Sequence, residues 1–250
     1  MSDQSSRILT VGWLMDPVKA STIWFSPEAL DLPTLEDPSA KAVTACPAVL
    51  QHEAKLYQLR CPIDAKFSAV ARPDGTLSFN NDLGHDSPID LKFLDEMIVP
   101  MPPDQWRHPK RPIFQIVTPY RFVADDYCFL EESGPIHDYK GSRWPGLVIS
   151  GRFQLDVWPR RLMWAFEWHD IDQPLTLKRG EPWFYIRLEG SDPAMSSRVV
   201  EAQWTPELKE YVDGIDSVTN YVKKTFSLFK TAQERRPSSL LTRRNRPTSL

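Results

Sequence analysis

Glycine is scarce in this sequence, and the glycine-rich signatures of several enzyme classes are missing with it. Only 10 of the 250 residues are glycine, and neither a GxxxxGK[ST] phosphate-binding loop nor a GxGxxG dinucleotide-binding turn occurs. Ser150-Gly151 lacks the earlier glycine that a nucleophile elbow needs, and there is no HExxH zinc motif. The sequence therefore shows no signature of a nucleotide-binding enzyme, a serine hydrolase or a zinc protease.

Cysteine and long apolar runs are also scarce. Cys46, Cys61 and Cys128 are an odd number, and no pair has the CxxC spacing of a redox or zinc site. Without a disulfide framework, a reducing compartment is expected, which predicts a cytoplasmic protein. No apolar run approaches the roughly 18 residues that a membrane helix requires, which predicts no membrane insertion.

Proline and aromatic residues are abundant instead. The 23 prolines argue for short elements joined by stiff loops, and the nine tryptophans and 12 phenylalanines supply a large apolar volume. Strand-like segments separated by turn signals lie at 113–118, 121–124, 127–131, 147–157, 162–168, 175–178 and 183–188. This spacing predicts a mainly β fold, namely an antiparallel β-sandwich, a jelly roll or a cupin-like barrel with C-terminal helices.

Two segments allow a more detailed prediction. In 162–168, Leu162, Trp164, Phe166 and Trp168 alternate with other side chains and are expected to face the core, with Glu167 more exposed than Trp164 and Phe166. The short link before it makes 147–157 and 162–168 adjacent antiparallel strands. In 56–71, one strand side is expected to carry Leu59, Cys61, Ile63, Ala65, Phe67 and Ala69. A turn at 73–76 would return the chain into a hairpin partner at 77–80.

In the last fifth of the chain, the apolar residues recur at the spacing of a helix rather than that of a strand. Thr205-Pro206-Glu207 is typical of a helix start, and Val218, Val222, Phe226 and Phe229 form one apolar helical stripe. A shorter helix is expected over 89–99. The predicted organisation is a β-rich domain over 1–192, a helical extension over 193–231 and a basic, flexible tail over 232–250, with truncation after Arg236 leaving the fold intact.

Charge is divided unevenly between the body and the tail. Residues 223–250 hold eight basic residues and one acidic residue, a net charge of +7, which leaves −10 on residues 1–222 of the total of −3. A basic tail on an acidic body predicts contact with a protein partner, or self-association, through the C-terminal helix and tail. Specific nucleic-acid binding is not supported, because no aromatic residues are interleaved with these arginines.

A metal site is the first chemical possibility. Glu167 and His169 have the one-residue spacing that puts two ligands on the same strand face, in the reverse of the usual order for a non-haem iron site. They are the candidate ligands for iron or another divalent metal. The alternative is that this face of the strand is simply polar and exposed to solvent, as in many antiparallel sheets.

A small-molecule site is the second possibility. Polar groups beside aromatic strands are the usual lining of a barrel mouth. The candidate ligand-binding residues are Arg121, Tyr127, Arg152, Trp168, His169 and Arg187. Core packing of the aromatic residues, and arginines extended into solvent, are the competing explanations.

Several short motifs resemble those of an uncharacterised protein family. They are Cys46-Pro47-Ala48, Cys61-Pro62-Ile63-Asp64, Thr118-Pro119-Tyr120-Arg121, Ile149-Ser150-Gly151 and Leu177-x-x-Gly180-x-Pro182. The family resembled has members of similar length in bacteria and in tailed phages of marine bacteria, and the likeness covers roughly residues 40–190. It implies a single β-rich domain and brings no established activity.

Two functions of different class follow from these observations. The first is a non-catalytic binding or assembly module that contacts partners through its body and C-terminal arm. The alternative is a small-molecule enzyme of the cupin type, a metal-dependent oxygenase with non-haem iron inside the barrel. The absence of a His-x-Asp/Glu pair favours the binding module.

Overall fold

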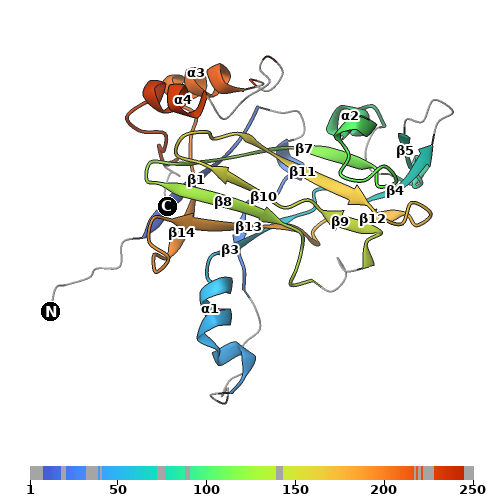
Figure 1. Ribbon diagram of the computed structural model, residues 1–250, viewed down its shortest axis with the longest axis horizontal. Coiled ribbons are helices and arrows are strands. Elements are labelled where there is room, and N and C mark those ends of the chain that lie inside the picture. The colour runs from blue at the N-terminus through green and yellow to red at the C-terminus, as the bar shows by residue number, and fades with distance from the viewer. Residues whose placement is uncertain are drawn as a thin grey trace, which may run out of the picture.

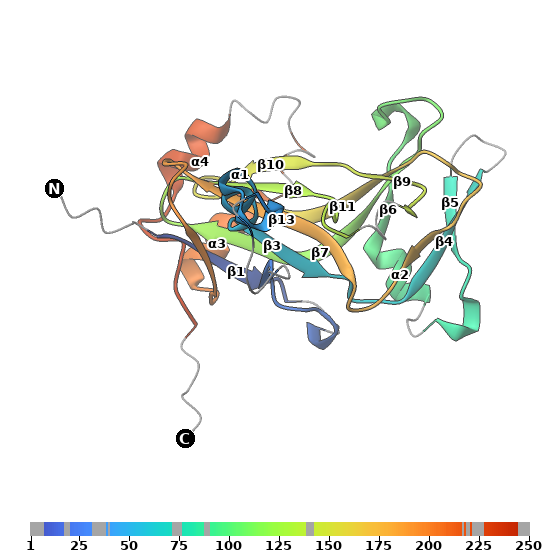
Figure 2. The same cartoon turned by 90° about the horizontal axis from the view of Figure 1, so that it is seen from below.

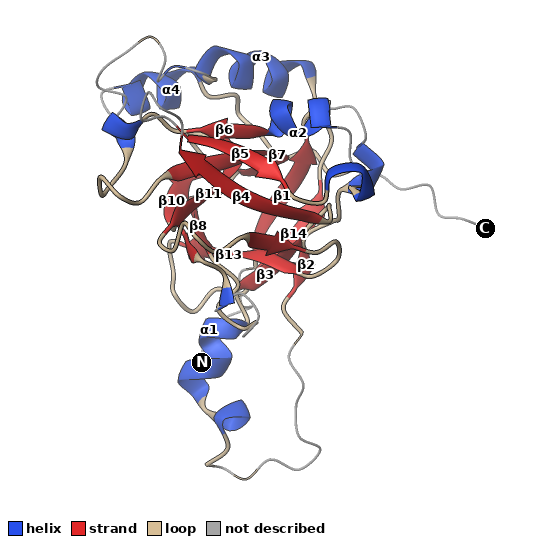
Figure 3. Ribbon diagram, turned by 90° about the vertical axis from the view of Figure 1, so that its right-hand side faces the viewer, coloured by secondary structure: helices blue, strands red, loops and turns tan. Residues whose placement is uncertain are grey.

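The computed structural model describes residues 8–17, 21–31, 39, 41–71, 77–87, 91–138, 143–216, 218, 221 and 228–244. Its strands form three sheets, and the two larger sheets curl around a shared core (Figures 1 and 3). The prediction of a mainly β fold with C-terminal helices is confirmed.

The largest sheet has six strands. Its order is β14 (Ser197–Glu201), β1 (Leu9–Met15), β7 (Ile113–Ala124), β11 (Arg161–Trp168) and β9 (Gly146–Val148), and β6 (Ile98–Pro100) also pairs with β7. Its pairs are antiparallel except that of β1 with β14, which is parallel.

The other two sheets are antiparallel throughout. The five-stranded sheet has the order β10 (Gly151–Gln154), β8 (Cys128–Ser133), β13 (Pro182–Gly190), β3 (Leu56–Arg60) and β2 (Glu28–Ala29). The three-stranded sheet has the order β12 (Leu175–Leu177), β4 (Ala65–Ala71) and β5 (Leu77–Asn81). Phe79 of β5 packs 4.8 Å from the ring of Phe114 in β7, which joins this small sheet to the core.

The space between the sheets is filled by aromatic side chains. Trp164, Phe166 and Trp168 of β11 are each fully buried, and the Trp164 ring lies 5.3 Å from that of Trp183 across the core. Glu167 is 3% exposed against 0% for its two neighbours, so the predicted order of exposure holds, but its side chain is buried rather than solvent-facing. Core packing therefore accounts for most of the aromatic side chains of the sequence.

Two predicted long strands are each broken into shorter ones. Segment 147–157 pairs with β11 only as far as β9, and Ile149 N–H donates the last bond to Ala165 O at 2.8 Å. The chain then enters the five-stranded sheet as β10, beside β8. Segment 56–71 divides in the same way into β3 and β4. A strand that turns the corner between two packed sheets changes partners without losing its alternation, so Leu59, Cys61, Ile63, Ala65 and Phe67 are all buried as expected.

The helices are short. They are the α-helices α1 (Pro47–Glu53), α2 (Leu91–Met97), α3 (Pro206–Ile215) and α4 (Phe229–Arg235), and the 3-10 helices η1 (Ser21–Ile23), η2 (Val43–Ala45), η3 (Gly84–Asp86) and η4 (Pro103–Gln105). The predicted start of α3 is confirmed, because Thr205 Oγ1 accepts a hydrogen bond from Leu208 N–H at 3.1 Å. The expected helix over 89–99 is α2, and its last residues belong to β6. Within the described part of the chain, each helix is too short or too polar to cross a bilayer.

Helices α3 and α4 cover the outer face of the six-stranded sheet (Figure 3). Leu208, Tyr211, Val212 and Ile215 are buried in a second apolar cluster with Leu14 and Val123 of that sheet. Of the predicted stripe, Phe229 packs 5.0 Å from the ring of Trp158, and Val218 is half-buried. Val222 and Phe226 lie outside the described residues, as does the predicted turn at 73–76.

Residues 236–244 correct the prediction of a free tail. Leu240 is 1% exposed, and Arg236 donates to the backbone oxygens of Asp156 and Asp125 at 2.6 and 3.1 Å. Gln203 N–H donates to Thr242 O at 2.9 Å, so the segment runs beside the end of β14. A Cβ on Gly12 would overlap the Leu241 side chain and lie 2.9 Å from Ala202 Cβ, so glycine lets this segment pack closely against β1. Residues 245–250 lie outside the described part, and the domain division at 192 and 232 stays a prediction.

Candidate functional site

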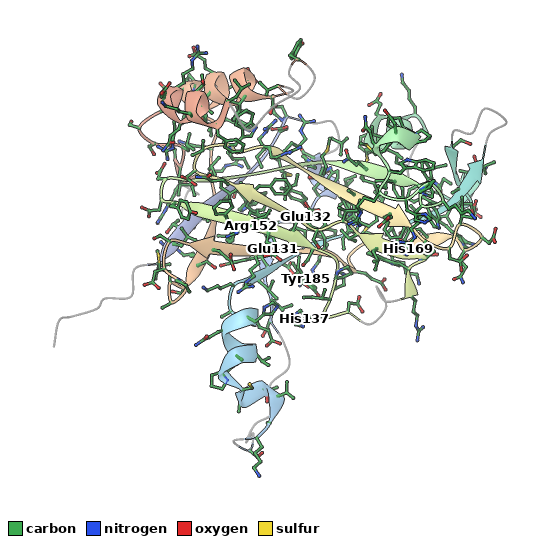
Figure 4. The ribbon with its side chains drawn as sticks, viewed as in Figure 1. Glu131, Glu132, His137, Arg152, His169 and Tyr185 are labelled. Carbon is green, nitrogen blue, oxygen red and sulfur yellow. The ribbon has the colours of Figure 1, made fainter. Side chains whose placement is uncertain are left out.

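The six predicted ligand-binding residues occupy three separate places. Arg121 lies on the outer side of the six-stranded sheet beneath α3. Trp168 and His169 lie at the far end of β11. Tyr127, Arg152 and Arg187 meet on the outer face of the five-stranded sheet. Figure 4 shows His169 well separated from Arg152.

Arg121 is occupied by partners of its own chain. It is 2% exposed, and its guanidinium makes two hydrogen bonds to Asp16, at 2.6 and 3.2 Å, and two to Asp216, at 3.0 and 2.5 Å. A fifth goes to Pro159 O at 3.2 Å, so all five donors are used. Burial would lower the pKa of Arg121, but the hydrogen bonds that it donates to Asp216 and Asp16 more than offset this effect and raise that pKa.

This network joins three parts of the fold. Asp16 follows β1, Arg121 belongs to β7 and Asp216 caps the C-terminus of α3. Arg161 of β11 also donates to Asp16, at 2.5 Å. The Arg121 cluster therefore holds α3 against the six-stranded sheet, and Arg121 has no N–H donor left to bind a ligand.

Trp168 and His169 do not share a site. Trp168 belongs to the core, and its indole N–H donates to Asp170 O and Gln173 O, at 2.9 and 3.1 Å. His169 is at the surface, with Nε2 3.4 Å from the Glu167 carboxylate. Arg107 Nη2 lies closer to the same carboxylate oxygen, at 2.7 Å.

The predicted metal ligands do not fit a divalent metal. Glu167 Oε2, the oxygen nearest His169, is already paired with the Arg107 guanidinium, which competes with a metal for that oxygen. The described residues supply no further His, Cys, Asp or Glu to complete a ligand group with Glu167 and His169. The arrangement is an arginine-paired buried carboxylate, and no step of metal chemistry follows from it.

The outer face of the five-stranded sheet brings charged residues into register. Glu131 of β8 stands opposite Arg152 of β10 on one side and Arg187 of β13 on the other. Both arginines nevertheless form ion pairs with Glu189. Arg152 Nη2 lies 3.1 Å from Glu189 Oε2, and Arg187 Nη2 lies 3.4 Å from Glu189 Oε1. This surface therefore alternates positive and negative side chains across three strands.

Aromatic rings lie at one end of this charged row. The guanidinium of Arg152 sits 4.1 Å over the ring centre of Phe129, and the Tyr127 ring packs 5.4 Å from that of Phe129. Tyr127 is 50% exposed. Arginine and aromatic residues are both enriched in protein interfaces, and two of the six predicted residues, Tyr127 and Arg152, meet at the Phe129 ring.

The other end of the face meets the loop 134–138. The His137 ring contacts Tyr185 of β13 at 5.7 Å, and its Nδ1 lies 4.0 Å from Glu53 of α1 (Figure 4). Burial and, after it, the charge of Asp138 raise the pKa of Tyr185 to about 12, so this phenol stays protonated at neutral pH. Ile136, in the same loop, is 62% exposed.

A helical projection stands on this side of the molecule. We call residues 41–55, which include η2 and α1, the arm (Figures 1 and 2). Neither η2 nor α1 contains a buried residue, and Val43 and Leu50 are 71% and 46% exposed. Sequence reasoning missed α1. The signal that was available is Pro47, which takes the first helical position after Cys46.

One further ionisable group sits inside the fold. Glu132 follows Glu131 along β8 and so points to the opposite side, into the core with Leu130. It is 2% exposed, and its Oε1 has no hydrogen-bond partner. Burial raises its pKa to about 8, against a smaller lowering effect of Arg160. No prediction from the sequence singled out this residue.

The sequence matches no protein-family model and no curated protein. The resemblance to bacterial and tailed-phage proteins therefore stays a prediction.

Proposed function

We propose that this chain is a non-catalytic binding or assembly protein that contacts a protein partner through its arm and the adjoining loop 134–138. The observation that carries this proposal is the exposure of the arm. A seven-residue helix gains little stability on its own, since isolated helices below roughly 12–15 residues are marginal in water. In a folded protein such a helix is normally held by an apolar face packed against the body, and α1 has no buried side chain.

The surroundings of the arm also suit a protein interface. Val43, Leu50 and Ile136 are exposed apolar side chains. Glu131 and Arg152, two members of the charged row, lie on the same side of the molecule as the arm (Figure 4). Apolar residues beside a polar surface are the usual anatomy of a protein contact. The cytoplasm remains the expected location.

The metal-dependent oxygenase, predicted as the alternative function, has no specific support. Its candidate ligand Glu167 is bound by Arg107, and the space between the sheets holds packed aromatic rings. Contact with a partner through the C-terminal helices stays a prediction, since α3 and α4 pack one side against their own sheet and leave Glu207 and Glu210 exposed.

Site-specific crosslinking in the native cells tests the proposed function. A photoreactive amino acid at Val43 is expected to give one discrete protein adduct. The same group at Lys209, on the exposed side of α3 with 65% of its side chain accessible, is the matched control and is expected to give none. Equal labelling at the two positions, or no adduct at Val43, would overturn the proposal.

A further inference from the structure

An apolar groove lies between α3 and α4, on the side of the molecule away from the arm. Its volume is about 660 Å³, within the range of roughly 300–1,000 Å³ typical of binding pockets. Its walls include Trp158, Tyr211, Ile215, Leu228 and Ala232. Because these side chains are mostly hydrocarbon, an occupant should be apolar.

The rim of the groove is mainly acidic. Glu207 and Glu210 of α3 lie on it, with Arg235 of α4 as the one basic residue among the groove's lining. Both glutamates are exposed. An occupant that carries a positive charge next to its apolar side chains would therefore complement the groove.

The arm of this same chain has that chemistry. Its far end presents Val43, the more exposed of its two exposed large apolar residues, and Lys41, which is also exposed. The rest of the arm offers Leu50 as a second apolar side chain. Arm and groove are thus both apolar, and the charge of Lys41 is opposite to that of the acidic rim.

The two surfaces lie on opposite sides of one molecule. α1 projects from the side of the five-stranded sheet, and α3 and α4 cover the six-stranded sheet (Figures 1 and 3). A chain cannot bring its own arm to its own groove without dismantling the sheets between them. The occupant that the structure can supply is the arm of a second copy.

We propose that the arm of one copy inserts into the α3–α4 groove of the next, so that the protein assembles head to tail. This inference rests on the proposed function and names its partner. Contact between two different surfaces is heterologous, and it produces a ring if the rotation closes or a filament if it does not. Val43 is the apolar anchor, and Glu207 and Glu210 receive Lys41.

Two single variants test the arm and the groove separately. Val43→Glu puts a carboxylate on the arm, where it would have to enter an apolar groove with an acidic rim. Gly214→Trp fills the groove from α3. At Gly214 an added Cβ meets no atom within 4 Å, and replacing a helical glycine favours the helix, so this variant is expected to fold. Val70→Glu, at an apolar side chain of β4 that is 41% exposed, is the control for added surface charge.

Analytical ultracentrifugation over a range of protein concentrations measures how strongly each chain associates with itself. The unaltered chain and Val70→Glu are expected to show species larger than the 28.8 kDa monomer. Val43→Glu and Gly214→Trp should each associate at least about 30-fold more weakly, as for loss of an interface hot spot. Unchanged circular dichroism and melting temperature confirm that each variant is folded.

Mixing the two variants is the decisive measurement. Gly214→Trp keeps an intact arm and Val43→Glu keeps an intact groove, so the mixture should form a one-to-one dimer and nothing larger. A monomeric unaltered chain, or a mixture that stays monomeric, overturns the inference. If crosslinking at Val43 then identifies a different protein, the proposed binding function stands while self-assembly fails.

Discussion

Glu132 gives the sharpest test of the energetics of this fold, because an ionisable group in the core costs stability whenever it carries charge. The side chain faces Leu130 and Ile186 on the inner side of the five-stranded sheet, with one oxygen unpartnered. Arg160 is the charged group that acts on it. Replacement by methionine keeps the length of the side chain and removes the carboxyl group.

The expected magnitude follows from its pKa. Burial raises the pKa of Glu132 from the ordinary 4.5 to about 8, and each pKa unit corresponds to about 1.4 kcal/mol. The unfolded chain ionises near pH 4.5, whereas the folded protein holds the proton until about pH 8. The stability contributed by the neutral acid is therefore complete below pH 4.5 and is lost progressively as the pH rises to about 8. The total loss is on the order of 5 kcal/mol, an upper bound because entering water lowers the cost of the charge.

Urea unfolding at pH 5, 6.5 and 8 measures this effect. Glu132→Met is expected to gain several kcal/mol over the unaltered chain at pH 8 and much less at pH 5, so its stability varies less with pH. The control is Glu131→Gln, one residue earlier on the outer face, which should keep the pH dependence of the unaltered chain. If Glu132→Met is less stable than the unaltered chain at pH 8, the carboxylate is held by a favourable contact and the reasoning from burial fails.

Two further predictions concern how the C-terminal region is held. Arg121→Met leaves the buried Asp16 carboxylate with only the half-exposed Arg161 as an ion-pair partner. The free energy of unfolding, measured by urea titration, should therefore fall by roughly 3–5 kcal/mol. A change within about 0.5 kcal/mol would show that the network is dispensable. Truncation after Arg236 removes the buried Leu240 and the hydrogen bonds to residues 201–203, so the melting temperature should fall, against the expectation from sequence. Leu240→Ala alone should cost about 2–5 kcal/mol, and an unchanged melting temperature of the truncated chain would restore the idea of a free tail.

The parts of the candidate site that sequence could predict are those set by local spacing. Arg152 and Arg187 were expected beside aromatic strands, and both lie on one face with Tyr127 because alternation fixes the side of a strand on which each residue stands. Arg121 has the same kind of sequence environment and lies on another sheet, fully paired. The sequence around an arginine does not contain Asp16 or Asp216, which are about a hundred residues away.

What the sequence determined by itself is the alternation of buried and exposed residues, the many short strands and the capped start of α3, since each depends on residues a few positions apart. The tertiary structure alone decided where 56–71 and 147–157 change sheets, that residues 236–244 pack on the body, and that Glu132 is buried while Glu131 is not. It also decided that the arm stands clear of the core. These features depend on which distant segments compete for the same apolar surface, and that competition is settled only when the sheets have closed around their core.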